Sequence, residues 1–237
     1  MLEAQLEQEA EQESEEHWIA VSDLMSGLMM LFLLIAVMYL VIVERKNDEI
    51  ERVVVLYEDL REELYTDLLA EFVDDLPLWG AELGEDLKFR FTNTSLLFEE
   101  GQSDLKPEFS FILSDFFPRY MAILTSEDYR NDILELRIEG HTSSSWSFAA
   151  DSDDAYMRNM ALSQERTRST LGFLFDLEDV AHEKDWLRER MTANGLSSSQ
   201  LILQDDGLED AERSRRVEFV VVTDAETRLS TILEEIR

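Results

Sequence analysis

The sequence predicts an α/β protein in which a single transmembrane helix and a helical linker precede an α/β sandwich, with helices packed on a small mixed sheet. Three observations lead to this prediction: a long uncharged apolar run near the amino terminus, a charged segment with helical apolar spacing, and a region where strand and helix patterns alternate. They divide the chain into an acidic tail (1–17), a span (18–43), a linker (44–86) and a folded domain (87–237).

The span contains the apolar run from Leu24 to Val43, in which 18 of 20 residues are apolar and none is charged. At the rise of an α-helix such a run covers about 30 Å, the thickness of a bilayer core. The preceding tail has seven Glu and no Lys or Arg, whereas a signal peptide has a basic flank and a small-residue cleavage site. We therefore expect an uncleaved, single-pass anchor that begins at the interfacial aromatic Trp18.

The linker carries 15 acidic residues against four basic ones, yet it keeps apolar residues three and four positions apart. This spacing predicts an amphipathic helix that ends between Asp74 and Pro77. The helix either packs on the following domain or forms a short parallel coiled coil that dimerises two copies. The apolar positions are Ile50, Val53, Tyr57, Leu60, Leu64, Leu68 and Phe72.

The folded domain is predicted from its alternating patterns. A helix at 107–124, opened by Pro107, lies between strands at 88–93 and 133–140. The patterns after residue 140 predict a helix at 157–177, a weak strand at 201–204, a strong strand at 215–223 and a closing helix at 225–236.

Composition excludes several function classes. The net charge of −32 argues against direct nucleic-acid binding, because phosphate would repel the chain. The absence of Cys removes disulfides, thiolate catalysis and Cys-based zinc sites, and His17, His141 and His182 are too scattered to predict a metal site. Neither a nucleophile elbow nor a phosphate-binding glycine loop is present. We expect no enzyme, no catalytic residue, no metal and no cofactor.

Asp23 stands out because it lies inside the apolar segment, five residues after Trp18. It is either an end charge that reaches the membrane interface or a functional acid, and an intramembrane carboxylate is a functional hypothesis by default. Small neighbours at Ser22, Ser26 and Gly27 would allow another helix to approach closely. We predict that Asp23 faces a helix–helix seam, where it can be protonated when shielded and ionised when it meets water, as a proton relay requires.

Several segments together resemble known families. Trp18–Met30, an aromatic followed by an acid and a Met-rich helix, resembles the transmembrane helix of MotB-type stator subunits. Residues 87–224 resemble the OmpA-like peptidoglycan-binding domain. The matching pieces are NTSLLFEEGQSDLKPE at 93–108, IEGHT at 138–142, NMALSQERT at 159–167 and SRRVEFVVV at 214–222.

Within that class, the acidic tail, the compact length and the loop GHTSSSW at 140–146 are most similar to the ZorB family of Zorya anti-phage systems. The resemblance implies a non-enzymatic subunit of an ion-driven membrane motor, in which a homodimer stands inside a ring of five ZorA-like multi-span subunits. Asp23 would carry the proton or sodium ion, and the OmpA-like domain would anchor to peptidoglycan. The alternatives are a flagellar MotB-type stator subunit and a passive cell-wall tether or envelope sensor.

The resemblance also implies a peptidoglycan site. An Asp after the Gly-His-Thr strand end and an Arg in the following helix hold the stem peptide in OmpA-like domains, but Ser143 stands at the position of that Asp. Either Arg166 binds a carboxylate alone, with weaker wall binding, or a different acid such as Asp151, Asp153 or Asp154 supports the site. The residues that match the helix motif are Asn159, Leu162, Ser163 and Arg166.

Two arguments give opposite orientations in the membrane. Arg45, Lys46 and Arg52 follow the span, so the positive-inside rule places the large domain in the cytoplasm. The resemblance implies an inner-membrane protein with a cytoplasmic amino terminus and a periplasmic domain. We adopt the second orientation, because a wall-binding domain has no ligand in the cytoplasm.

Overall fold

The computed structural model describes residues 2–224, and the predicted closing helix at 225–236 lies outside them. The chain forms two compact units, Met1–Arg52 and Val53–Arg237, which are described separately. The helices are α1 (Leu2–Phe72), α2 (Leu76–Trp79), α3 (Thr94–Leu97), α4 (Pro107–Leu124), α5 (Ser152–Asp176), the 3-10 helix η1 (Glu178–Glu183), α6 (Lys184–Arg190) and α7 (Ala211–Ser214). The strands are β1 (Ala81–Leu83), β2 (Lys88–Phe91), β3 (Ile133–His141), β4 (Met191–Ser197) and β5 (Arg216–Thr223).

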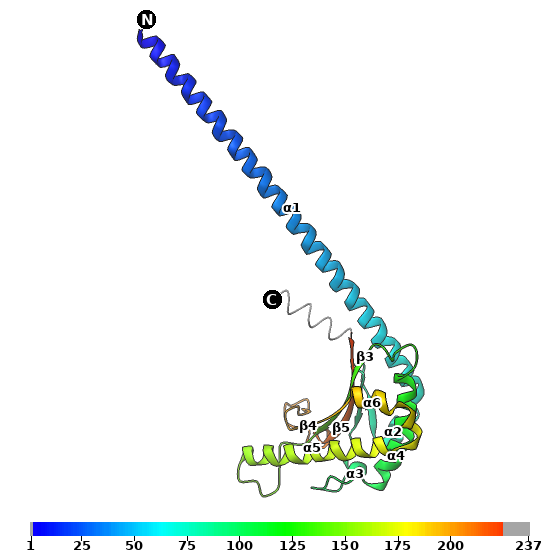
Figure 1. The fold of residues 1–237 in the computed structure, drawn as a ribbon. Helices are drawn as coiled ribbons and strands as arrows, with labels where there is room; N and C mark the ends of the chain where they lie inside the picture. The colour runs from blue at the N-terminus through cyan, green and yellow to red at the C-terminus, as the bar shows by residue number, and fades with distance from the viewer. Residues whose placement is uncertain (1, 225–237) are drawn as a thin grey trace. The chain divides into compact units, whose positions relative to one another are not determined.

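The second unit is built on a five-stranded mixed sheet with the order β1-β2-β5-β3-β4 (Figure 1). β5 lies at its centre and pairs antiparallel with both β2 and β3. The outer pairs differ, because β1 is antiparallel to β2 whereas β4 is parallel to β3.

The long helices α4 and α5 cover one face of this sheet. Ile138 on β3 lies directly opposite Phe219 on β5, so the two side chains share a face. The Phe219 ring is 5.2 Å from that of Phe116 on α4, and the backbone of α5 lies against Gly140, two residues beyond Ile138. The predicted fold class, helices packed on a small mixed sheet, is confirmed.

Aromatic rings fill the space between the sheet and α4. Phe116 lies at the centre, with its ring centroid 4.5 Å from that of Phe89 and 4.9 Å from that of Tyr120. Such closely spaced rings contribute beyond their buried area. The other rings that pack against Phe116 are those of Phe72, Trp79, Phe91 and Phe219.

The carboxyl-terminal turns of α1 belong to this core. Leu64, Leu68 and Phe72 are fully buried. Arg119 on α4 lies 4.8 Å from the centre of the Phe72 ring and forms a 2.7 Å ion pair with Glu71. This end of the predicted linker therefore packs on its own domain, whereas a coiled coil nearer the membrane stays a prediction.

Two strands differ from the prediction. The prediction of a strand at 201–204 is wrong. The Ile202 carbonyl accepts a hydrogen bond from the Asp210 N–H, and the Ile202 N–H donates to the Ser214 hydroxyl, so both backbone groups of Ile202 are satisfied within a loop. The sheet instead gains β4, whose sequence MTANGLS lacks an alternating apolar pattern. It also gains β1, which lies within the segment assigned to the linker.

Candidate functional site

The first candidate site is the apolar segment of α1. Among the described residues one helix, Val21–Asp48, is long and apolar enough to cross a membrane, with a mean hydropathy of 2.7. Asp23, Ser26 and Gly27 share one face of it, since residues three and four apart are neighbours on a helix. The Ser26 hydroxyl donates a 2.8 Å hydrogen bond to the Ser22 carbonyl. The Ser26 hydroxyl hydrogen is therefore satisfied within the helix. Small residues lie on the same face as the Asp23 carboxylate.

The second candidate site is a cavity of about 600 Å³ in the folded unit. It lies where the carboxyl end of β3 and the start of β5 meet α5 and the loop at 97–101. The structure brings the four residues of the predicted peptidoglycan motif together in its wall, and Ser143 joins them. The motif residues are Asn159, Leu162, Ser163 and Arg166.

Two glycines place α5 against the sheet at this cavity. Gly140 and Gly195 lie directly opposite each other on β3 and β4. A Cβ on Gly195 would lie 2.3 Å from the backbone nitrogen of Gln164, and one on Gly140 would lie 2.9 Å from the Ser163 carbonyl oxygen. Only residues without a side chain allow this approach, so the glycines fix how deep α5 lies above the strand ends.

Asn159 and Ser163 hold the walls of the cavity in place. The Asn159 amide donates to the carbonyls of Ser143 and Ser145, at 3.0 and 3.2 Å. The Ser163 hydroxyl accepts a 3.1 Å hydrogen bond from the backbone N–H of Ser197. Both side chains are buried and use polar atoms within the protein, so they position the site.

Arg166 is the strongest ligand-binding candidate. Its guanidinium donates to the carbonyls of Gln102 (2.8 Å) and Glu99 (3.1 Å) and lies 4.7 Å from the centre of the Phe98 ring. Burial and the neighbouring Arg215 lower the pKa of Arg166 to about 10, which leaves it charged at neutral pH. Because a guanidinium has five donors, it can bind an anion in addition to these carbonyls.

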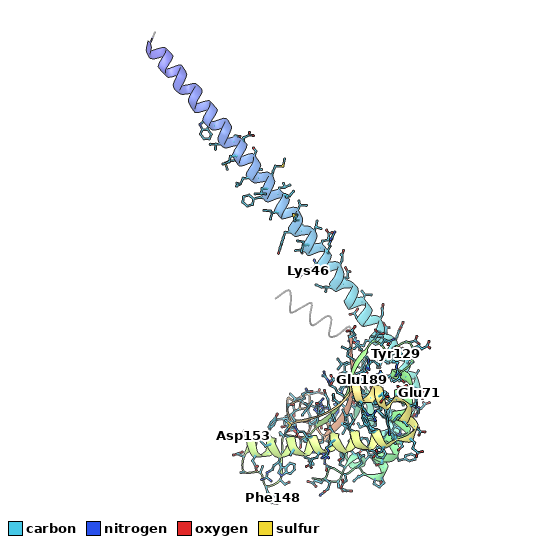
Figure 2. The ribbon with its side chains drawn as sticks, in the orientation of Figure 1. Lys46, Glu71, Tyr129, Phe148, Asp153 and Glu189 are labelled. Carbon is cyan, nitrogen blue, oxygen red and sulfur yellow. The ribbon has the colours of Figure 1, made fainter. Side chains whose placement is uncertain are left out.

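The acids expected to replace the missing aspartate are absent from the cavity wall that the structure describes. Asp151 accepts a hydrogen bond from the Asp154 N–H at the start of α5, and Asp154 pairs with Arg158 at 2.8 Å. Figure 2 shows Asp153 at the amino-terminal end of α5, after the loop that carries the exposed Phe148. The acids that do line the cavity come from the loop before α4 and are Glu99 and Glu100.

Comparison with known proteins identifies the chain. It is 44% identical over 221 residues to the Zorya protein ZorB of Escherichia coli, covering 93% of each chain. The chain belongs to the ZorB family. The predicted resemblance is thereby confirmed, while no protein-family model matches this ZorB-family chain.

Solved structures similar to this ZorB-family chain include three from bacteria. A MotB-like protein of Desulfovibrio vulgaris is 21% identical, covers 70% of this chain and 96% of its own, and has a TM-score of 0.48. The cell wall anchor of the Pseudomonas aeruginosa T6SS is 21% identical, with coverages of 66% and 97% and a TM-score of 0.45. The periplasmic domain of Helicobacter pylori MotB is 16% identical, with coverages of 62% and 84% and a TM-score of 0.42.

Proposed function

We propose that this ZorB-family chain is a non-enzymatic subunit of an ion-driven membrane motor in anti-phage defence. Asp23 carries a proton or sodium ion, and the domain after the linker anchors the complex to peptidoglycan. Two copies stand inside a ring of five ZorA-like subunits. The observation that carries the proposal is a lone acid in the apolar span of a chain with a ZorB relative at 44% identity. That relative also favours the Zorya system over a flagellar stator.

The surroundings of Asp23 support an ion-carrying role. The 18-residue window that defines the span has no part buried within the chain, so lipid or other subunits must cover it. An ionised carboxylate costs about 2.5–3.5 kcal/mol at the centre of a membrane span, and a functional role is the default hypothesis for an acid within one. A partner helix packed on the face of Ser26 and Gly27 would give the acid a polar, gated environment.

The cavity supports wall anchoring through an anion. Arg166 and Arg215 both line it, close enough for the charge of Arg215 to lower the pKa of Arg166. Ser143 supplies a hydroxyl where an aspartate would bind an ammonium. The site therefore suits a free carboxylate of a stem peptide more than its amino group.

Asp23→Asn tests the motor. The amide is nearly isosteric but cannot ionise, so protection of cells against phage is lost while co-purification with the ring subunit persists. Asp48→Asn, a carboxylate at the other end of the same apolar helix, is the matched control and keeps protection. Full protection by the Asp23→Asn protein would refute the ion-carrying role.

Arg166→Lys tests wall anchoring with the full chain in detergent and purified peptidoglycan sacculi. Lys keeps the charge but loses the fork, so retention on sacculi falls by about tenfold, which is one hydrogen-bonded ion contact of about 1.4 kcal/mol. Arg168→Lys, on the exposed side of α5, stays at the wild-type level. Arg215→Met weakens retention without altering the hydrogen bonds of the 99–102 loop. Wild-type retention by both cavity variants would exclude this cavity as the anchor.

Orientation is tested by a single introduced thiol. The natural chain has no Cys, so Ser145→Cys gives one reactive site on an exposed loop. We expect a membrane-impermeant maleimide that enters the periplasm to label it in intact cells. Labelling only after lysis would place the domain in the cytoplasm.

A further inference from the structure

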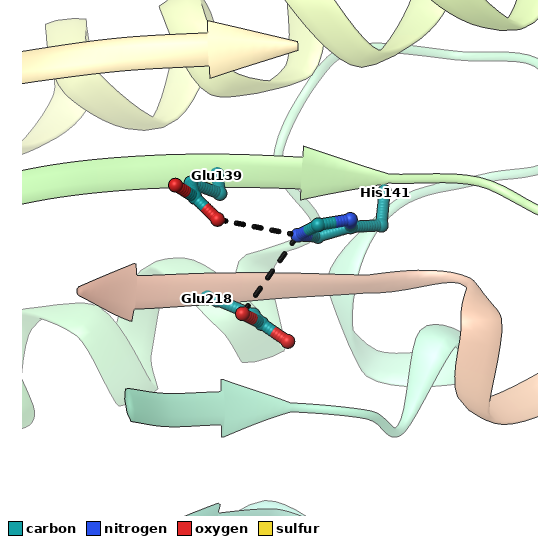
Figure 3. Close-up of side chains that lie close together, drawn as sticks. All are labelled: Glu139, His141 and Glu218. Atoms are coloured by element: carbon teal, nitrogen blue, oxygen red, sulfur yellow. Dashed lines mark ion pairs between the residues drawn. The ribbon is translucent and has the colours of Figure 1, made fainter. Parts of the chain in front are cut away.

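A second group of polar residues lies on the face of the sheet opposite α4 and α5. Glu139 and His141 are two positions apart on β3, so their side chains lie on the same face of the sheet. Glu218 on β5 lies directly opposite Glu139. Figure 3 shows the three side chains converging, with the His141 Nε2 atom 3.7 Å from a Glu139 oxygen and 3.8 Å from Glu218 Oε2. All three residues are at least nine-tenths buried.

Three polar atoms of this cluster lack the hydrogen bonds that buried polar groups normally have. Neither ring nitrogen of His141 has a hydrogen-bond partner among the described residues, and the same holds for Glu218 Oε2. Two carboxylates that face each other across strands repel, and within the described chain Glu139 has His141 as its ion-pair partner. Among the described residues, the His141 ring is therefore the part of the cluster that is left with no hydrogen bond at either nitrogen, and a bound metal ion would give one of them a partner.

We propose that Glu139, His141 and Glu218 bind one divalent transition-metal ion, of which Zn²⁺ fits best. One imidazole nitrogen and two carboxylate oxygens form a three-ligand zinc set that leaves a fourth position for water. Tetrahedral ligands at about 2.0–2.1 Å from zinc lie about 3.4 Å apart. The two separations to His141 exceed this by only 0.3–0.4 Å, and all three ligand atoms lie within 4.8 Å of one another, so side-chain rotations must draw the two carboxylates together around the ion.

Basic side chains around Glu218 would compete with a metal ion for its carboxylate. Its Oε1 atom accepts hydrogen bonds from Arg216 at 2.5 Å and from Arg90 at 3.2 Å, which leaves Oε2 toward His141. Burial raises the pKa of Glu218, but the hydrogen bond and charge of Arg216, together with the charges of His141 and Lys88, outweigh it and hold the pKa below its ordinary value. Lys88 lies 3.5 Å from Oε2 and must withdraw when the metal binds. Its flexible, partly exposed stem borders a cavity of about 320 Å³ that also reaches Glu139, which gives both an exit for the ammonium and an entry for the ion.

A metal here would tie β3 to β5 beside the larger cavity. His141 also lines that cavity and directly precedes Thr142 and Ser143. Bound zinc would therefore fix the strand end that carries the ligand-binding loop. Zinc binding at this cluster is independent of the motor and of peptidoglycan.

Zinc binding to the full-length protein in detergent tests the proposal. The protein is stripped with EDTA and titrated with Zn²⁺ against a chromophoric chelator in salt high enough to suppress loose binding to surface acids. We expect one tight site per chain, and Co²⁺ in its place should give visible ligand-field bands. His141→Gln and Glu139→Gln each lower the affinity by about tenfold or more, since even residues behind metal ligands contribute about that much.

His182→Gln is the matched control, because His182 is exposed on η1. It should retain the wild-type affinity and the Co²⁺ bands. Glu139→Gln keeps the proposal testable if His141→Gln fails to fold, as judged from its melting temperature without metal. The absence of a tight site, or equal affinity in the His141→Gln and His182→Gln proteins, would overturn the proposal.

Discussion

Gly195→Ala should destabilise the folded unit by driving α5 away from the sheet. The new Cβ would lie 2.3 Å from the Gln164 nitrogen, a backbone atom that no side-chain rotation can move. Ordinary contact requires about 3.5 Å, so α5 must shift by about 1 Å. Overpacking of this kind costs about 1–3 kcal/mol, which lowers the melting temperature by about 2–12 °C for a domain of this size.

The assay follows unfolding of the full chain in detergent through tryptophan fluorescence, since Trp79 and Trp186 are both buried. Gly172→Ala is the matched control on α5. A Cβ at Gly172 meets nothing within 4 Å, and Ala is the better helix former, so this variant gains about 0.5–1 kcal/mol. Because one variant should lose stability and the other should gain it, the comparison separates the effect of contact with the sheet from the effect of helix propensity. Equal melting temperatures for the Gly195→Ala and wild-type proteins would refute the packing argument.

Two further predictions concern the core and its charges. Phe116→Ala removes the ring at the centre of the aromatic core and should cost about 3–5 kcal/mol, measured by denaturant unfolding; a loss below about 1 kcal/mol would contradict that placement. The pKa of Glu218 in the folded protein lies below its ordinary value of 4.5. The ionised side chain therefore stabilises the folded state fully above pH 4.5, and this stabilisation is lost as the pH falls through the lowered pKa. With chelator present, Glu218→Gln should therefore flatten the fall in melting temperature below pH 4.5 relative to Glu165→Gln, an exposed control, and parallel curves would contradict the prediction.

The fold could be predicted where side-chain periodicity and backbone signals agree. Pro107 starts α4 at the predicted residue, because proline suits the first turn of a helix. β4 was missed because Asn194 and Gly195 interrupt its pattern: a residue that must let a helix approach closely cannot also carry an apolar side chain. At 201–204 the apolar residues looked strand-like, but Leu203 is exposed.

The sites were predictable to different degrees. The shared location of Asn159 and Arg166 could be predicted from the spacing of the motif, because both residues lie on one helix. The cluster around His141 was missed because spacing to other histidines says nothing about glutamates on a neighbouring strand. The alternation of Glu139 and His141 was visible in the sequence, but Glu218 joins them only through the register between β3 and β5.

The burial of the last turns of α1 has a mechanical consequence. A domain hung on a flexible loop lets the loop extend before any packed contact is strained. Here Leu64, Leu68 and Phe72 are part of the core, and exposing each would cost about 1.5–3 kcal/mol. Tension that reaches these turns must break the domain's own packing, so the polypeptide carries load at its point of attachment instead of yielding there.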